Sequence, residues 1–268
     1  MVVKLGSCVK YEDLFKAPRY GKHISEYYDK ITGGAIEGQV HLFVAGSGVG
    51  KTRTGISVCC ELLEQGWSVG YLTFEQSKEQ IAEMIVDHFR GDGTREQSFD
   101  RIKDLPCYIK RFENSSSDSV LATIEQFKGY NAVIFDYLAL PDESPAESFN
   151  ASVTGLRMIK KIKDIAERNN QFIWCMAQGK NKEPNNIDTF ASVDNIWISR
   201  QLINPVEVAV VANKVEKDLL QLDFIKVRYP RGYSRCRVLR NFDYKTCRST
   251  DISILDEMGE QLDENETE

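Results

Sequence analysis

The feature that most constrains the fold is a glycine-rich segment, AGSGVGKT, which spans Ala45 to Thr52. It follows the apolar run from His41 to Val44 and precedes residues 53–58, whose pattern predicts the start of a helix. A turn of this kind directs several backbone N–H groups inward at the positive end of the helix, where they can bind phosphate groups. The spacing fits the phosphate-loop pattern, with Ala45 at a position where glycine is commoner.

This loop supplies the first candidate ligands. Lys51 would reach the outer phosphates of a nucleoside triphosphate, and the hydroxyl of Thr52 would bind Mg²⁺. We therefore predict that the chain binds ATP together with Mg²⁺. The expected nucleotide contacts in the loop are Ala45, Gly46, Ser47, Gly48, Val49, Gly50, Lys51 and Thr52.

Composition excludes several other classes of protein. The 268 residues are 42% hydrophobic, which is enough for a packed core. No apolar run approaches the ~20 residues of a membrane helix, so we expect no membrane partner. The seven cysteines are scattered without a C-x-x-C pair, which favours buried reduced thiols over structural zinc or disulfides. We expect a soluble, cytoplasmic protein, located in the host cytoplasm if the chain is viral.

The net charge of −6 is unevenly distributed along the chain. Residues 251–268 hold eight acidic and no basic residues, and this composition predicts a disordered tail. Residues 221–248 hold eight basic and two acidic residues. This basic stretch is either the solvated face of an edge hairpin or a surface that binds phosphates.

Apolar patterns downstream of the loop predict strands that alternate with helices and then give way to consecutive strands. Strands are expected near residues 68–74, 107–110, 132–136, 171–177, 207–212, 222–228 and 236–241, and helices near 78–89, 118–127 and 153–168. This order predicts an α/β fold with a mainly parallel central sheet, flanking helices and an antiparallel C-terminal extension.

Three polar residues end predicted strands. Ligands of open parallel sheets bind at the carboxyl ends of the strands, close to where the phosphate loop must lie. There Asp136 could anchor Mg²⁺, Glu75 could act as general base on the attacking water, and Gln178 could sense the γ-phosphate. Each residue has a simpler alternative role: a helix cap, a surface acid and a turn glutamine, respectively.

The order of these motifs resembles the RecA-like motor domain of DnaB-type hexameric replicative helicases, with the phage members nearest. The segments that carry the resemblance are ITGGAIEGQ (31–39), AGSGVGKT (45–52), YLTFEQS (71–77), VIFDYLAL (133–140), MAQGKNK (176–182) and IKVRYPRG (225–232). The resemblance implies a RecA-like P-loop fold and a DNA-dependent ATP hydrolase. It further implies a homo-oligomer, a hexameric ring, that translocates on single-stranded DNA as a helicase.

The resemblance also assigns residues by position. Lys226 and Arg228 match the pair that reaches across the subunit boundary to a neighbour's nucleotide, with Arg228 as arginine finger and Arg231 as competitor for that role. Candidate DNA contacts are Lys180, Lys182 and Arg200. A few such cations per subunit, repeated around a ring, could grip the phosphates of one strand. Ordinary solvated lysines remain the alternative for Lys180 and Lys182, and the acidic loop 141–150 is not expected to hold phosphate.

The domain organisation follows from the extent of the resemblance. We expect an ATPase motor domain at residues 31–248, an N-terminal segment at 1–30 and an acidic tail at 249–268. Residues 11–28 could supply a short helix that packs on an adjacent subunit. Full-length relatives usually carry an N-terminal domain that meets the primase, whereas residues 1–30 alone precede the ITGG segment here. We therefore do not expect the sequence to support a primase or loader partner.

Two other functions remain open at this point. A RecA- or RadA-like recombination ATPase would share Lys51, Glu75 and Asp136 but would form filaments on DNA. A nucleotide-switch accessory or helicase-loading protein would bind ATP and hydrolyse it weakly. Mass measurement with ATP and Mg²⁺ separates the three, because it would give closed hexamers, open filaments, or monomers and dimers.

Overall fold

The structure is a computed structural model of the chain. It describes residues 20–112, 116–138, 148–180, 190–192, 194, 196, 200–230, 233 and 235–262. The described helices are α3 (Glu26–Thr32), α4 (Lys51–Glu64), α5 (Lys78–Phe89), α6 (Arg95–Ile102), α7 (Ser117–Gln126), α8 (Ser148–Asn169) and the 3₁₀ helix η3 (Arg200–Ile203). The strands are β1 (Val40–Ala45), β2 (Val69–Thr73), β3 (Cys107–Arg111), β4 (Ala132–Leu138), β5 (Phe172–Gln178), β6 (Val208–Glu216), β7 (Leu219–Val227), β8 (Cys236–Asp243) and β9 (Arg248–Leu255).

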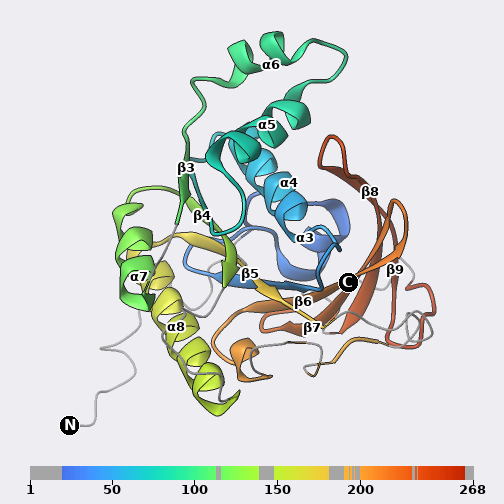
Figure 1. The fold of residues 1–268 in the computed structure, drawn as a ribbon. Helices are drawn as coiled ribbons and strands as arrows, with labels where there is room; N and C mark the ends of the chain where they lie inside the picture. The colour runs from blue at the N-terminus through green and yellow to red at the C-terminus, as the bar shows by residue number, and fades with distance from the viewer. Residues whose placement is uncertain are drawn as a thin grey trace, which may run out of the picture.

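These strands form one nine-stranded sheet in the order β3-β2-β4-β5-β1-β6-β7-β8-β9 (Figure 1). The six strands from β3 to β6 are parallel, and β7, β8 and β9 continue the sheet antiparallel. The predicted fold class is therefore confirmed. We call the edge at which the parallel strands end the carboxyl edge, and the opposite edge the amino edge.

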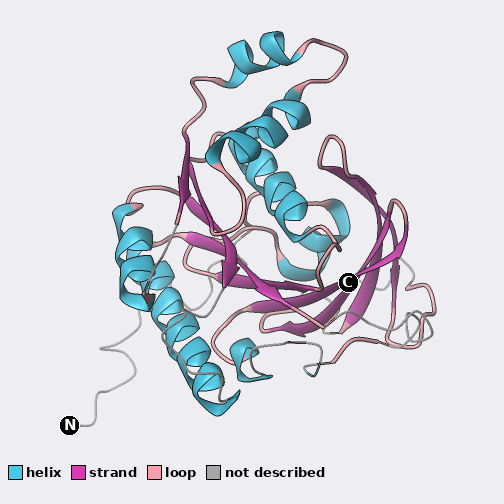
Figure 2. Cartoon of the chain, in the orientation of Figure 1, coloured by secondary structure: helices cyan, strands magenta, loops and turns pink. Residues whose placement is uncertain are grey.

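Helices cover the parallel part of the sheet on both faces (Figure 2). One face packs against α3, α4 and α5, and its core includes the stacked rings of Phe43 and Trp174, whose centroids lie 5.6 Å apart. The other face packs against α7 and α8. All six residues of β1 are buried, because a central strand of a doubly covered sheet meets apolar side chains on either side. None of the described helices is both long and apolar enough to span a membrane.

Helix α3 packs inside this chain, in the space between α4 and the curled strands β8 and β9 (Figure 1). Tyr28 is buried against Trp174 and Phe224, and its hydroxyl lies 2.8 Å from Nδ1 of His41. The boundary expected at residue 30 thus falls within a helix of the main core. The helix expected at 11–28 lies largely outside the described residues, because residues 1–19 are not described.

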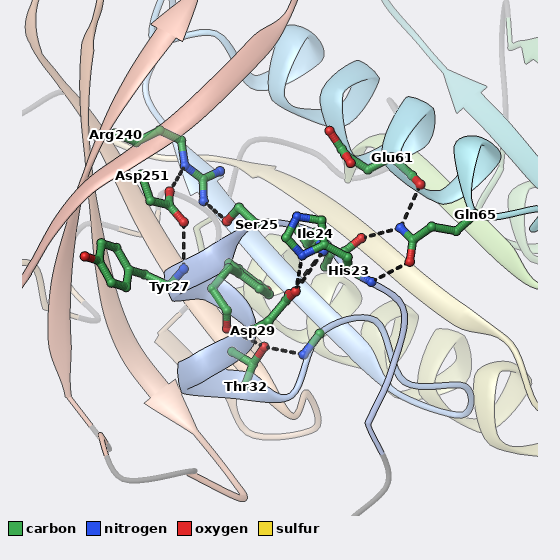
Figure 3. A network of polar contacts seen from close by, with 12 residues as sticks. His23, Ile24, Ser25, Tyr27, Asp29, Thr32, Glu61, Gln65, Arg240 and Asp251 are labelled. Atoms are coloured by element: carbon green, nitrogen blue, oxygen red, sulfur yellow. Dashed lines mark hydrogen bonds and ion pairs between the residues drawn. The ribbon is translucent and has the colours of Figure 1, made fainter. Parts of the chain in front are cut away.

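The acidic segment 249–268 is not simply a disordered tail, and this expectation is corrected. Residues 248–255 form strand β9, which pairs antiparallel with β8 over its length. Within this strand, Asp251 is buried in an ion pair with Arg240 and accepts a hydrogen bond from the backbone N–H of Tyr27 (Figure 3). Residues 263–268 lie outside the described part.

The basic stretch 221–248 does not form one cationic surface. Arg237 is buried with Asp223, Arg240 is buried with Asp251, and the exposed Arg235 pairs with Glu257. A charge count over 28 consecutive residues overlooked acids that the sheet brings in from other strands. Five of the six described cysteines are buried, and Cys107 is partly exposed.

Candidate nucleotide-binding site

The phosphate loop lies where the sequence predicted it, between the end of β1 and the start of α4. Gly50 precedes the helix with φ 111°, and Gly48 has φ 75°, conformations that side chains rarely adopt. A Cβ atom on Gly50 would lie 2.8 Å from the ring of Tyr244. The turn therefore depends on glycine both for its backbone and for the close approach of a distant segment.

Lys51 is buried at the carboxyl edge and reaches across to the next strand. Its Nζ donates hydrogen bonds to the backbone oxygens of Ala45 and Gly46, at 3.1 and 3.2 Å, and to Oε1 of Gln178 at 2.7 Å. Gln178 is placed there because β1 and β5 are parallel neighbours in which Ala45 pairs with Gln178. Burial lowers the pKa of Lys51, whereas the negative charges of Glu75 and Asp136 raise it.

Asp136 lies on β4 at the same edge and is fully buried. Its Oδ2 accepts a hydrogen bond from the hydroxyl of Tyr71 at 3.1 Å. Burial raises the pKa of Asp136 to about 6, although hydrogen bonds from Thr52 and Tyr71 and the charge of Lys51 act in the opposite direction. Its Oδ1 has no hydrogen-bond partner among the described residues.

The oxygens of Asp136 and Thr52 fit a magnesium ion. A buried carboxylate oxygen without a partner is costly unless a cation or a water molecule completes it. Carboxylate and hydroxyl oxygens are also the hard ligands that Mg²⁺ prefers, together with water and phosphate oxygens. The donor set is therefore consistent with the metal role predicted for both residues.

Glu75 is exposed and lies two residues beyond the end of β2. Strands β2 and β4 are parallel neighbours in which Thr73 pairs with Asp136, so Glu75 comes to lie beside Tyr137. Burial raises the pKa of Tyr137, and the negative charges of Glu75 and Asp136 and a hydrogen bond with Glu75 raise it further. The ring of Tyr137 also lies 5.7 Å from Nζ of Lys51. Glu75 thus stands at the rim of the site that Lys51 and Asp136 line.

Sequence reasoning missed a second wall of the site. The hydroxyl of Tyr244 donates a hydrogen bond to the backbone oxygen of Val49 at 3.0 Å, and Arg53 donates one to the backbone oxygen of Tyr244. The ring also lies 4.4 Å from Nζ of Lys214. Tyr244 and Lys214 line a cavity of about 810 Å³ between the β6–β7 and β8–β9 turns. No local pattern identifies Tyr244, because only the folded sheet brings it to the loop.

Lys226 and Arg228 lie at the amino edge, away from the phosphate loop of their own chain. Because β7 runs antiparallel to β6, Lys226 pairs with Ala209 near the start of β6, whereas Ala45 pairs with Ala212 near the loop. Nζ of Lys226 donates hydrogen bonds to the backbone oxygens of residues 203 and 204, at 2.6 and 2.9 Å. Neither cation can complete a nucleotide site within one subunit.

The remaining predicted residues are only partly described. Lys180 is exposed two residues beyond Gln178. Arg200 begins η3, but its side chain is not among the described ones, and Lys182 and Arg231 lie outside the described residues. Of the acidic loop 141–150, residues 148–150 belong to α8 and the others are not described.

No protein-family model matches the chain, and no curated protein matches it. Solved structures do. A DnaB-like replicative helicase, whose structure was determined with its interactions with primase, matches 94% of this chain over 67% of its own length, with a TM-score of 0.75 and 14% identity. The ATPase domain of a phage helicase matches 90% of this chain over 95% of its own length, with a TM-score of 0.74 and 14% identity.

At this identity the likeness concerns the fold. It confirms the resemblance drawn from the motifs, since the matched region includes most of the sheet and its helices. The chain therefore has the fold of the RecA-like ATPase domains of DnaB-like replicative helicases.

Proposed function

We propose that this chain is a DNA helicase motor that hydrolyses ATP with Mg²⁺ and translocates on single-stranded DNA as a homo-hexameric ring. One observation carries the proposal. The carboxyl edge gathers Lys51, Asp136 and Gln178 around a phosphate loop, while Arg228 lies at the opposite edge. A site divided in this way is complete only where two subunits meet.

Each residue then has a defined task. Lys51 binds the outer phosphates in exchange for its present contact with Gln178, which frees the amide to follow the γ-phosphate. Glu75 accepts a proton from the attacking water. Thr52 and Asp136 hold Mg²⁺, which when bound neutralises charge on the phosphate oxygens. Arg228 of the adjacent subunit stabilises the charge that develops on the transferring phosphoryl group.

The nucleobase and ribose would extend from the loop toward Tyr244. The phenol ring offers an apolar face beside the loop, and Lys214 lies over the ring. Stacking on an aromatic face is tolerant of base identity. The proposal therefore expects little discrimination among nucleoside triphosphates.

The test combines two substitutions with a hydrolysis assay in the presence and absence of single-stranded DNA. Lys51→Ala should abolish turnover, because the outer phosphates lose their cation. Arg228→Ala should lower turnover on the order of 10³-fold with nucleotide binding nearly intact, since an arginine finger acts on the transition state. Lys103→Ala, which removes an exposed lysine that pairs with Asp100 on α6, is the matched control and should change neither property.

Helicase activity itself requires strand displacement on a forked duplex, with each tail blocked in turn. Displacement that depends on one tail supports the motor and gives its polarity. Hydrolysis that DNA does not stimulate would contradict the motor. Open filaments with ATP would instead favour a recombination ATPase, and monomers or dimers a nucleotide switch.

A further inference from the structure

Glu207 is a buried carboxylate at the amino edge, immediately before β6, with no part in the proposed chemistry. The residue is 4% exposed. One carboxylate oxygen, Oε1, lies 3.0 Å from Nη1 of Arg228. The other, Oε2, accepts a hydrogen bond from the backbone N–H of Val40 at 3.0 Å and lies 3.0 Å from Nζ of Lys163 on α8. Glu207 therefore connects Arg228 to β1 through Val40 and to α8 through Lys163. Arg228 is the residue that the proposed function directs to a neighbour's nucleotide.

The guanidinium of Arg228 is held on two sides. Its Nη2 donates hydrogen bonds to the backbone oxygens of Asn204 and Pro205, at 2.9 and 3.4 Å. The backbone N–H of Arg228 donates to the backbone oxygen of Glu207 at 2.8 Å. A guanidinium has five N–H donors, and these contacts with described residues use three of them. The side chain is 35% exposed, so the remaining donors can face outward.

We propose that Glu207 is the positioning residue for the arginine finger. This inference rests on the proposed function, because it gives Arg228 a target on the adjacent subunit. A long side chain that is already ordered loses less conformational entropy when it meets its target. Catalysis by a positioned charge is also sensitive to displacements of about 1 Å, which can cost roughly 100-fold in rate.

Lys163 makes this arrangement workable when the finger engages phosphate. A buried carboxylate left with no cation would strongly destabilise the folded protein. Because Lys163 contacts Oε2, Glu207 keeps one cation when the guanidinium shares its charge with a phosphoryl group. The side chain of Lys163 is only 12% exposed, so this contact is shielded from water.

A merely structural role for Glu207 must be separated from a positioning role. Glu207 could also have a structural role, because it contacts the N–H of Val40 at the start of β1 and Lys163 on α8. Glu207→Gln removes the charge but keeps an acceptor for the N–H of Val40. The shorter Glu207→Asp keeps the charge and should retain part of the function, which provides a second variant if the first does not fold.

The experiment mixes subunits. A donor, Lys51→Ala, lacks the phosphate-loop cation but carries Arg228, and an acceptor, Arg228→Ala, has the reverse defect. Each alone should be inactive, and their mixture should recover DNA-stimulated hydrolysis at interfaces where the donor supplies its arginine to the acceptor. Glu207→Gln is then added to one partner at a time.

On the donor, Glu207→Gln should reduce the recovered rate roughly 10- to 100-fold. On the acceptor it should leave the recovered rate unchanged, because that subunit has no finger to position. Glu167→Gln on the donor is the matched control, since Glu167 also pairs with Lys163 at 3.0 Å but does not contact Arg228. Glu207→Asp on the donor should give an intermediate rate.

Two failures are distinguishable. A parent mixture that recovers no activity contradicts the shared site, and with it the proposed function. Recovery that survives Glu207→Gln on the donor, or that falls equally with the substitution on either partner, contradicts only the positioning role.

Discussion

At the scale of single residues, Gly50 shows how tightly the phosphate loop is fitted to the far end of the chain. Its φ of 111° excludes most side chains, and Tyr244 fills the space that a Cβ atom would need. Gly48 has a comparable φ of 75° but no atom within 4 Å of its Cβ position. Both glycines are needed for a positive φ, but only Gly50 is also needed to leave room for Tyr244.

Gly50→Ala should destabilise the protein by about 1–3 kcal/mol more than Gly48→Ala, because only the first forces Tyr244 out of place. Denaturant unfolding of both variants measures the difference. Tyr244→Ala added to Gly50→Ala should reduce the excess. Equal losses for the two glycines would show that the contact with Tyr244 costs nothing.

The buried His41 should make the stability of the folded protein depend on pH. Burial, and then the charge of Lys163, lowers the pKa of His41 to about 3. Because the folded value is below the unfolded value of about 6.5, the unfolded chain gains a proton first as the pH falls. The stability due to a neutral His41 is therefore complete above pH 6.5 and is lost between pH 6.5 and 3.

His41→Gln should reduce the slope of the unfolding free energy against pH, between pH 3 and 6.5, by up to about 1.4 kcal/mol per pH unit. The reason is that one proton fewer is taken up on unfolding. The amide can still contact the hydroxyl of Tyr28, which lies 2.8 Å from Nδ1 of His41. Unfolding free energies at several pH values give the slope. An unchanged slope in His41→Gln would contradict the assignment.

At the scale of elements, local patterns predicted most helices and strands, and the misses have physical causes. Helix α6 begins with a capping box between Thr94 and Gln97, a sequence signal that was available but went unused. Strand β9 was missed because the acids that follow it dominate the composition of residues 249–268, whereas β9 itself contains a single acid, Asp251, whose partner lies on another strand. Sequence patterns report local preference, whereas the environment of a charge depends on the fold.

The buried pair of Asp251 and Arg240 should be essential to the union of β8, β9 and α3. Asp251→Asn should cost about 3–5 kcal/mol, because it leaves the Arg240 guanidinium buried without its anion. Glu26→Gln removes only an exposed pair with Lys30 on α3, which should contribute under about 1 kcal/mol. Thermal and denaturant unfolding compare the two, and similar losses would contradict the importance of the buried pair.

At the scale of the whole molecule, the sheet separates the two halves of the candidate site. The carboxyl-edge residues were predictable, because parallel strands bring strand-end polar residues such as Asp136 and Gln178 together. Tyr244 and Glu207 were not predictable, since their neighbours are distant along the chain. The separation means that the proposed site needs two subunits, although the nucleotide contacts proposed for the phosphate loop need only one.

Turnover per subunit should therefore rise with protein concentration, whereas the fraction of subunits that bind nucleotide should change little. Hydrolysis and nucleotide binding measured across a dilution series, together with mass, test this. The Arg228→Ala variant, assembled or not, should remain slow throughout. A rate per subunit that stays constant while the assembly dissociates would place the whole site within one chain.

The opposed edges also fix the symmetry of any assembly that uses them. A surface that offers the arginine and a different surface that receives it meet head to tail, so a two-fold dimer cannot satisfy both. An open array always contains one fewer working interface than it has members, whereas a closed circle wastes none. A closed ring would therefore have one more active site, and one more buried interface, than an open array of the same number of subunits.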